Sequence, residues 1–178
     1  QDDPSTPGGG NYDGYSDRRL THTNEEIRDY LQDFFGYNST RIYYTATEAD
    51  RTTLRYNNGF FSDGQLLPDD LRDPLFDWNG SAENIINEFN NGRFLVIHRD
   101  HGLEDGSGWG HPRFRSTQNE NHVALLNNIN SLPIVFSINC SSGKFTNSEC
   151  LTESLIRSEN GGAVGVLAPS DNSYSGYN

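Results

Sequence analysis

The stretches FLVIHRDHG, residues 94–102, and LPIVFSINCSSG, residues 132–143, decide the fold of this 178-residue chain. The first contains a short unbroken apolar run at 94–97, and the second contains a run at 134–138 that is apolar except for Ser137. Polar residues and a glycine follow each run. Short apolar runs of this kind are typical of strands that lie in a parallel sheet and are buried on both faces. The two stretches therefore predict two strands of one sheet.

Helices are expected around these strands. Ser81 predicts the N-cap of a helix that Gly92 ends. Further along, we expect helices over about 121–129 and 150–158 and a strand over 163–167. Because helices and strands alternate, the pattern specifies a three-layer α/β/α fold with a mainly parallel sheet and right-handed crossovers.

One helix is predicted in the first part of the chain. Thr23 and Glu26 form a capping box ahead of an amphipathic segment, and Gly36 supplies its end. Residues 40–44 follow as a short run of β-branched and aromatic residues, which predicts a strand. The length fits one domain, residues 1–178. Two segments are rich in Gly, Asp or Pro without periodicity and are expected to be irregular, 1–20 and 50–80.

Composition excludes several function classes. The net charge of −12 and the pI near 4.6 argue against a nucleic acid or an anionic membrane as the partner, because both would repel the chain. No apolar run approaches the roughly 20 residues that a membrane span needs. Two cysteines exclude a disulfide scaffold and a four-ligand zinc site. Because the chain lacks Met altogether, we expect a mature piece whose leader is gone.

Chemistry-bearing residues follow the two central strands. His101 and Gly102 come after the first, and Cys140 comes after the second. If the strands are neighbours, their ends lie about 4.8 Å apart. A thiolate that attacks a carbonyl and an imidazole that protonates the departing amine form a minimal acyl-transfer pair. The amides of Gly102 and Cys140 could then stabilise the oxyanion.

A plainer interpretation exists for each residue alone. A single free Cys is more often a small buried hydrophobe, and a lone His is more often hydrogen-bonded structure. Their joint position on consecutive strand ends favours catalysis. We interpret His98 as a structural or rim residue. Cys150, in a predicted helix, is expected to be buried and not bonded to Cys140.

The region from 81 to 170, together with GYNSTRIYY at 36–44, resembles the catalytic subdomain of the gingipain-type (C25) cysteine peptidases, relatives of caspases and legumains. The corresponding elements are FLVIHRDHG, GWGHPRF, LLNNINSLPIVFSINC, SSGKF and CLTESLIRSENGGAVGVLAPS. The resemblance implies a caspase-like fold, a His101–Cys140 dyad and an oxyanion hole of the Gly102 and Cys140 amides. Asn139 stands where the family usually has Ala.

The resemblance also implies where substrate binds. The loop before the first helix contributes Asp17, and the loop after the strand at 163–167 contributes Ser170, Tyr174 and Ser175. Asp17 would suit a basic substrate side chain unless the adjacent Arg18 and Arg19 neutralise it. The family's sheet needs further strands at both ends, so we expect this chain to be a fragment that lacks additional segments or domains.

The function expected is that of a secreted or cell-surface bacterial cysteine endopeptidase that acts on protein or peptide substrates. Two alternatives stay open: a gingipain-like sortase of type IX secretion, which would pass the acyl group to an amine, and a pseudopeptidase that only binds. No cofactor is expected to be required. Three carboxylates offer ligands for a structural calcium ion, although we expect them to form a solvated acidic loop: Asp100, Glu104 and Asp105.

Overall fold

The computed structural model describes residues 19–45, 66–146 and 149–173. The chain divides into two compact units, Gln1–Asn79 and Gly80–Asn178. The second unit contains both stretches that carry the predicted chemistry. None of the helices within the described ranges is long and apolar enough to span a membrane.

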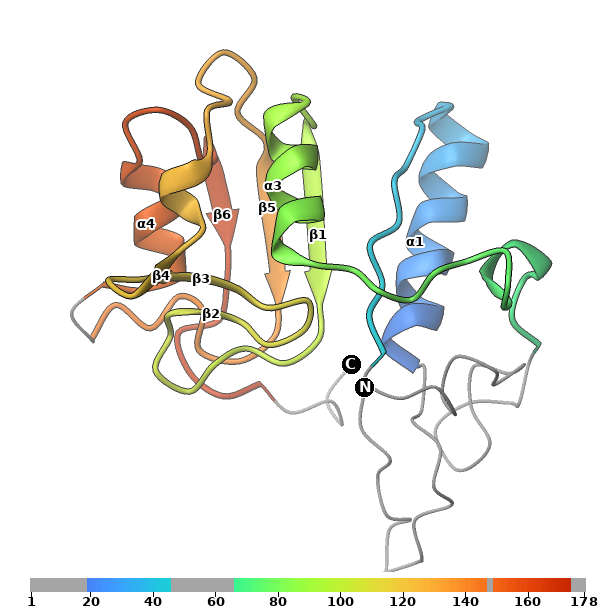
Figure 1. Ribbon diagram of the computed structural model, residues 1–178, viewed down its shortest axis with the longest axis horizontal. Coiled ribbons are helices and arrows are strands. Elements are labelled where there is room, and N and C mark those ends of the chain that lie inside the picture. The colour runs from blue at the N-terminus through green and yellow to red at the C-terminus, as the bar shows by residue number, and fades with distance from the viewer. Residues whose placement is uncertain (1–18, 46–65, 147–148, 174–178) are drawn as a thin grey trace, which may run out of the picture. The chain divides into compact units, whose positions relative to one another are not determined.

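A parallel sheet forms the centre of the second unit. It contains β1 (Leu95–Arg99), β5 (Ile134–Ile138) and β6 (Gly165–Leu167) in the order β1-β5-β6. Both neighbouring pairs are parallel, and the three arrows in Figure 1 point to the same end of the sheet. The mixed α/β class with a parallel sheet is therefore confirmed, and both central strands lie where the sequence predicts them.

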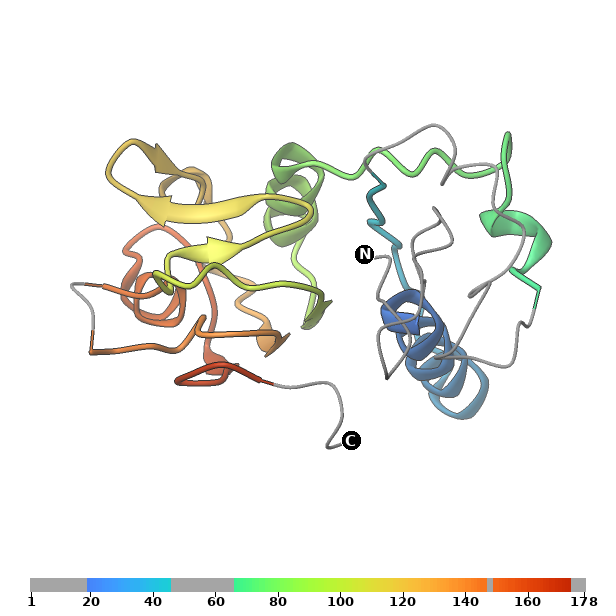
Figure 2. The same ribbon diagram turned by 90° about the horizontal axis from the view of Figure 1, so that it is seen from below.

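Two helices pack on one face of this sheet (Figures 1 and 2), α3 (Ala82–Asn90) and α4 (Leu151–Arg157). Ser81 caps α3 as expected, since its hydroxyl accepts a hydrogen bond from the Asn84 amide at 3.3 Å. Gly92 ends the helix region with a φ of +79°, a conformation that costs glycine little. The helical face of the sheet is buried, with Val135 fully covered.

The opposite face of the sheet is open in the described residues. The side chains of Ile134, Phe136 and Ile138 alternate with buried ones along β5 and are 36–44% exposed. The expectation that these strands are buried on both faces is therefore wrong for β5. The cause is topological: in the described part of this unit, α3 and α4 lie on the same side of the sheet and cover that face.

A small antiparallel sheet, which the sequence did not indicate, covers part of the same face as the helices. It contains β2 (Gly108–Trp109), β3 (Phe114–Thr117) and β4 (Glu120–Asn121), in that order. Its side chains add to the core, because Trp109 and Phe114 are almost completely buried and their ring centroids are 5.2 Å apart.

The helix expected over 121–129 is wrong. Only a three-residue 3-10 turn forms there, η2 (Val123–Leu125). The side chain of Asn90, the last residue of α3, takes up two backbone groups that a helix would use. Its Oδ1 accepts from the Asn127 amide at 2.8 Å, and its Nδ2 donates to the Leu125 carbonyl at 3.4 Å.

The first unit begins, in its described part, with α1 (Arg19–Phe35). The helix starts four residues before Thr23, so the expected capping box lies inside it and the predicted start is wrong. The predicted end is confirmed, because Gly36 has a φ of +71° and its amide bonds to the Gln32 carbonyl at 2.9 Å.

The strand expected over 40–44 is also wrong, since Tyr44 alone pairs, with Asn79. Side chains hold the segment extended. The buried Glu25 carboxylate of α1 accepts from Arg41 Nη2 and from the Tyr43 hydroxyl, both at 2.6 Å.

The described part of the expected irregular segment, 66–80, is irregular apart from one turn, η1 (Asp69–Leu71). It builds a small core from Leu67, Leu71 and Trp78, against which Tyr43 and Phe76 pack.

Candidate active site

The carboxyl ends of β1 and β5 bring the predicted chemical groups together. Arg99 and Ile138 form the last pair of the parallel register, and His101 and Cys140 each follow two residues later. A Cβ atom placed on Gly102 would lie 1.8 Å from the carbonyl oxygen of Cys140. The two backbones are therefore in direct contact, and only glycine fits at 102.

The backbone around His101 is fixed by the small antiparallel sheet. The His101 carbonyl accepts from the Gly110 amide at 2.8 Å, and the Leu103 amide donates to Gly108 at 3.0 Å. Gly102 and Trp109 consequently face each other as a non-hydrogen-bonded pair. This pairing does not use the Gly102 amide, while the His101 side chain is exposed at the surface.

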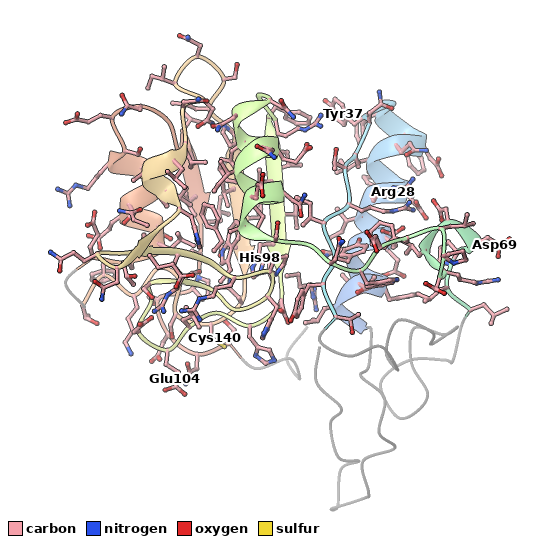
Figure 3. All side chains as sticks on the ribbon, in the orientation of Figure 1. Arg28, Tyr37, Asp69, His98, Glu104 and Cys140 are labelled. Carbon is pink, nitrogen blue, oxygen red and sulfur yellow. The ribbon has the colours of Figure 1, made fainter. Side chains whose placement is uncertain are left out.

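Cys140 lies in a tight turn at the end of β5 (Figure 3). Its side chain is partly buried, and its Sγ accepts from the Ser173 amide at 3.4 Å. Ser141, the next residue, has a φ of +56°, which is uncommon for a residue other than glycine. Such a conformation persists only where the surroundings hold it.

The segment after β6 runs along this turn. The Ser141 amide donates to the Asp171 carbonyl at 3.1 Å, and the Gly143 amide donates to the Pro169 carbonyl at 2.9 Å. Ser170 lies in this segment and is exposed. The other residues that the resemblance implies for substrate binding lie outside the described residues: Asp17, Tyr174 and Ser175.

The second cysteine has a structural position. Cys150 is 1% exposed and is the N-cap of α4, where the Glu153 side chain accepts from the Cys150 amide at 3.0 Å. Burial raises the pKa of the Cys150 thiol. Both cysteines are free thiols, which confirms the expectation that Cys140 and Cys150 are not bonded.

The acidic residues next to His101 do not converge. Asp105 accepts from the Ser107 hydroxyl at 2.6 Å and pairs with Arg115 at 3.0 Å. The Asp100 carboxylate is 3.8 Å from Nδ1 of His111, and burial raises the pKa of Asp100. In the described part of the chain, no group of three or more His, Cys, Asp or Glu side chains is placed to hold a metal ion. Structural calcium therefore stays a prediction without support from these contacts.

A buried polar cluster beneath the strand ends was missed by the sequence reasoning. Asn139 and His98 contact each other there, and the His98 ring stacks on Trp109 with centroids 4.3 Å apart. The expectation that His98 is structural agrees with its burial. A signal was available, because His98 and Ser137 interrupt apolar strands at positions that pair in the parallel register.

Comparisons with known proteins identify the relatives of this chain. A model of peptidase family C25 matches residues 5–178. Gingipain R2 of Porphyromonas gingivalis is 35% identical over 102 residues, which cover 54% of this chain and 13% of the relative. Gingipain R1 of the same organism is also 35% identical over 102 residues and is covered to 10%. The chain thus spans only a small part of the length of these relatives.

Solved structures of gingipains are similar as well. The Arg-specific cysteine proteinase gingipain R superimposes with a TM-score of 0.48 and 35% identity, over 53% of this chain and 22% of that chain. The complex of the RgpB pro- and mature domains from Porphyromonas gingivalis gives the same TM-score and coverage at 33% identity. Because the family model matches nearly the whole sequence, the chain belongs to peptidase family C25, the gingipain-type cysteine peptidases.

Proposed function

We propose that this chain is the catalytic portion of a secreted or cell-surface bacterial endopeptidase that cleaves peptide bonds with Cys140 as nucleophile and His101 as proton-transfer partner. The observation that carries the proposal is the backbone contact between Gly102 and Cys140 at the carboxyl ends of two adjacent parallel strands. Because of that contact, the residue that follows His101 lies directly against the backbone of Cys140. Protein or peptide chains are the substrates.

The reaction proceeds through a thioester. The Cys140 thiolate attacks the carbonyl carbon of the scissile bond, and the carbonyl electron pair moves to oxygen. The amides of Gly102 and Cys140 donate to that oxyanion. The C–N bond then breaks as the His101 imidazolium gives its proton to the departing amine. Water attacks the thioester while His101 takes up the water proton, which releases the acid and restores the thiolate.

Substrate binding involves the segment after β6. Its backbone follows the Cys140 turn, and the Ser173 amide is within 3.4 Å of the nucleophilic sulfur. Ser170, Tyr174 and Ser175 belong to this binding region in our proposal, together with Asp17 from the loop before α1. A carboxylate at Asp17 would favour a basic residue before the cleaved bond.

Labelling with peptidyl acyloxymethyl ketones tests the proposal on the full-length protein. Probes with Arg, Asp or Leu at the residue before the reactive group are compared, and modified peptides are mapped by mass spectrometry. We expect one probe class to modify Cys140 and leave Cys150 unmodified. A Cys140→Ala variant should lose all labelling, whereas Cys150→Ala should keep it.

Other outcomes separate the alternatives. If no probe modifies Cys140 while the protein is folded, the peptidase proposal fails and a binding module takes its place. A glycyl peptide is added to the cleavage assay as an amine acceptor. If Cys140 is labelled but the main product is the substrate's acyl fragment joined to that peptide by an amide bond, the acyl group passes to an amine, as in a transpeptidase. Hydrolysis that is insensitive to the added amine supports the endopeptidase.

A further inference from the structure

Beneath the two strand ends lies a closed set of buried polar side chains, which we name the polar ring. Its members are all buried, and the most exposed of them is 8% exposed. They come from three separate segments: β1, β2 and the region from β5 into the Cys140 turn. Figure 3 shows His98 above Cys140 at this end of the sheet. The members are His98, Trp109, Ser137, Asn139 and Ser142.

Chemistry determines the direction of every hydrogen bond in the polar ring. Trp109 Nε1 can only donate, and it donates to Ser137 Oγ at 2.7 Å. Ser137 therefore gives its own hydroxyl proton to Ser142 Oγ at 2.9 Å. Ser142 in turn donates to Asn139 Oδ1 at 2.7 Å. The amide nitrogen of Asn139 donates to Ser137 Oγ, which closes the ring, and to His98 Nδ1, both at 2.9 Å.

His98 is bonded to Asn139 as a neutral imidazole. The carbonyl oxygen of His111 lies 3.4 Å from Nε2 and can only accept, so the proton of the neutral ring is on Nε2 and Nδ1 accepts from Asn139. This tautomer also determines the orientation of the Asn139 amide. A reversed amide would need the proton on Nδ1, and Nε2 would then face the His111 carbonyl as a second acceptor.

The polar ring joins both halves of the proposed dyad. Asn139 precedes Cys140, and Ser142 follows it by two residues, so their 2.7 Å bond spans the turn that contains Cys140 and the left-handed Ser141. His98 lies three residues before His101, on the same strand and its continuation. The Asn139 side chain therefore connects the turn that contains Cys140 to β1, the strand that precedes His101.

We propose that Asn139 is a positioning residue that holds Cys140 in register with His101. The inference rests on the proposed function, because it names what aligns that dyad. Removing the Asn139 amide takes the donor from His98 Nδ1 and the acceptor from the Ser142 hydroxyl, and both groups are buried. The turn around Ser141 then relaxes and the sulfur moves out of alignment with the bound carbonyl.

Asn128 offers a matched control. It is also a buried asparagine of the second unit, 4% exposed against 5% for Asn139, and it likewise makes three hydrogen bonds. Its partners are the Gly162 amide at 2.8 Å, the Gly162 carbonyl at 3.1 Å and the Ser131 carbonyl at 3.3 Å. Both partner residues precede strands, so Asn128 supports the amino ends of the sheet, away from Cys140.

The test compares Asn139→Ala with Asn128→Ala in the full-length protein. The probe is the acyloxymethyl ketone that modifies Cys140 best in the parent, and the readouts are the maximal inactivation rate, the probe's half-saturating concentration and the thermal midpoint. For Asn139→Ala we expect the maximal rate to fall about 10- to 100-fold, because a small misplacement of reacting groups slows a reaction by this order. The half-saturating concentration should stay within about threefold of the parent value. Asn128→Ala should lower the thermal midpoint similarly and leave the maximal rate unchanged.

If Asn139→Ala fails to fold, Ser142→Ala supplies the same test, because it removes only the bond across the turn. Its maximal rate should fall about three- to tenfold. The inference is overturned if the folded Asn139 or Ser142 variant inactivates at the parental rate while the parent itself is labelled, and the proposed function then stands. If the parent is not labelled at Cys140, the proposed function fails and the positioning role with it.

Discussion

Acid should destabilise the second unit through His98. Burial lowers the pKa of His98 to about 3, whereas a histidine in an unfolded chain has a pKa near 6.5. Because the folded value is the lower one, the unfolded state takes up the proton first as the pH falls. Stability is therefore lost between about pH 6.5 and pH 3, and it is fully present above that window.

The size of the effect at pH 5.0 depends little on the exact folded value. In the unfolded chain the pKa of His98 lies about 1.5 units above pH 5.0, and each unit is worth about 1.4 kcal/mol. The free energy of unfolding should therefore be about 2 kcal/mol lower at pH 5.0 than at pH 7.5. Hydrogen exchange of peptides from β5 measures this within the unit. Their protection factors should fall about 30-fold between the two pH values.

Two variants isolate the contribution of His98. His98→Phe keeps a ring against Trp109 but cannot titrate, so its protection should be about 30-fold less pH-sensitive than that of the parent. His22→Asn removes a histidine of the first unit, in α1, and should keep the parental sensitivity. Burial raises the pKa of Asp100, so protonation of this carboxylate stabilises the folded state as the pH falls. This opposite contribution cancels from the comparison because Asp100 is present in all three proteins. Equal pH sensitivity in the parent and in His98→Phe would refute the buried, neutral His98.

Substitutions that target the strand-end contact and the second cysteine give two further tests. Gly102→Ala would place its methyl group 1.8 Å from the Cys140 carbonyl and should abolish probe labelling, whereas Gly165→Ala, which meets no atom within 4 Å, should leave labelling intact. A labelled Gly102→Ala protein would contradict the close backbone contact. Cys150→Ala should lower stability by on the order of 1 kcal/mol and leave Cys140 reactive. Loss of Cys140 reactivity in a folded Cys150→Ala variant would argue for a catalytic part of the second thiol.

Local signals predicted the parallel sheet well. The runs at 94–97 and 134–138 are short, mostly apolar and bounded by polar residues, so length and composition together indicated strands. Gly36 and Gly92 marked helix ends because each adopts a positive φ that other residues avoid. The placement of His101 and Cys140 beyond neighbouring strands followed from the alternation of helices and strands.

Tertiary contacts decided what the sequence did not indicate. Strand β2 has two residues and β4 has two, which is too short for an alternating pattern to be visible. The segment at 40–44 has strand-like residues, but Arg41 and Tyr43 bind the Glu25 carboxylate and hold it outside any sheet ladder. Such side-chain contacts override local propensity.

The polar ring was equally hidden. Each of its members looks ordinary in the sequence, and only the parallel register brings His98 opposite Ser137. Asn139 was visible as a departure from the usual Ala, yet its meaning depends on partners that are 41 and three residues away, His98 and Ser142. A pattern that joins segments so far apart cannot be inferred from periodicity.

The reactivity of the two thiols tests the central claim, that Cys140 is a nucleophile activated by His101, most directly. The rate of iodoacetamide alkylation is measured for each cysteine by peptide mapping at pH 6.5, in the full-length protein and in His101→Ala. An imidazole partner favours the thiolate, so Cys140 should react at least about tenfold faster than in His101→Ala, and far faster than the buried Cys150. If both thiols react at the same slow rate and His101→Ala changes neither, Cys140 is not the nucleophile.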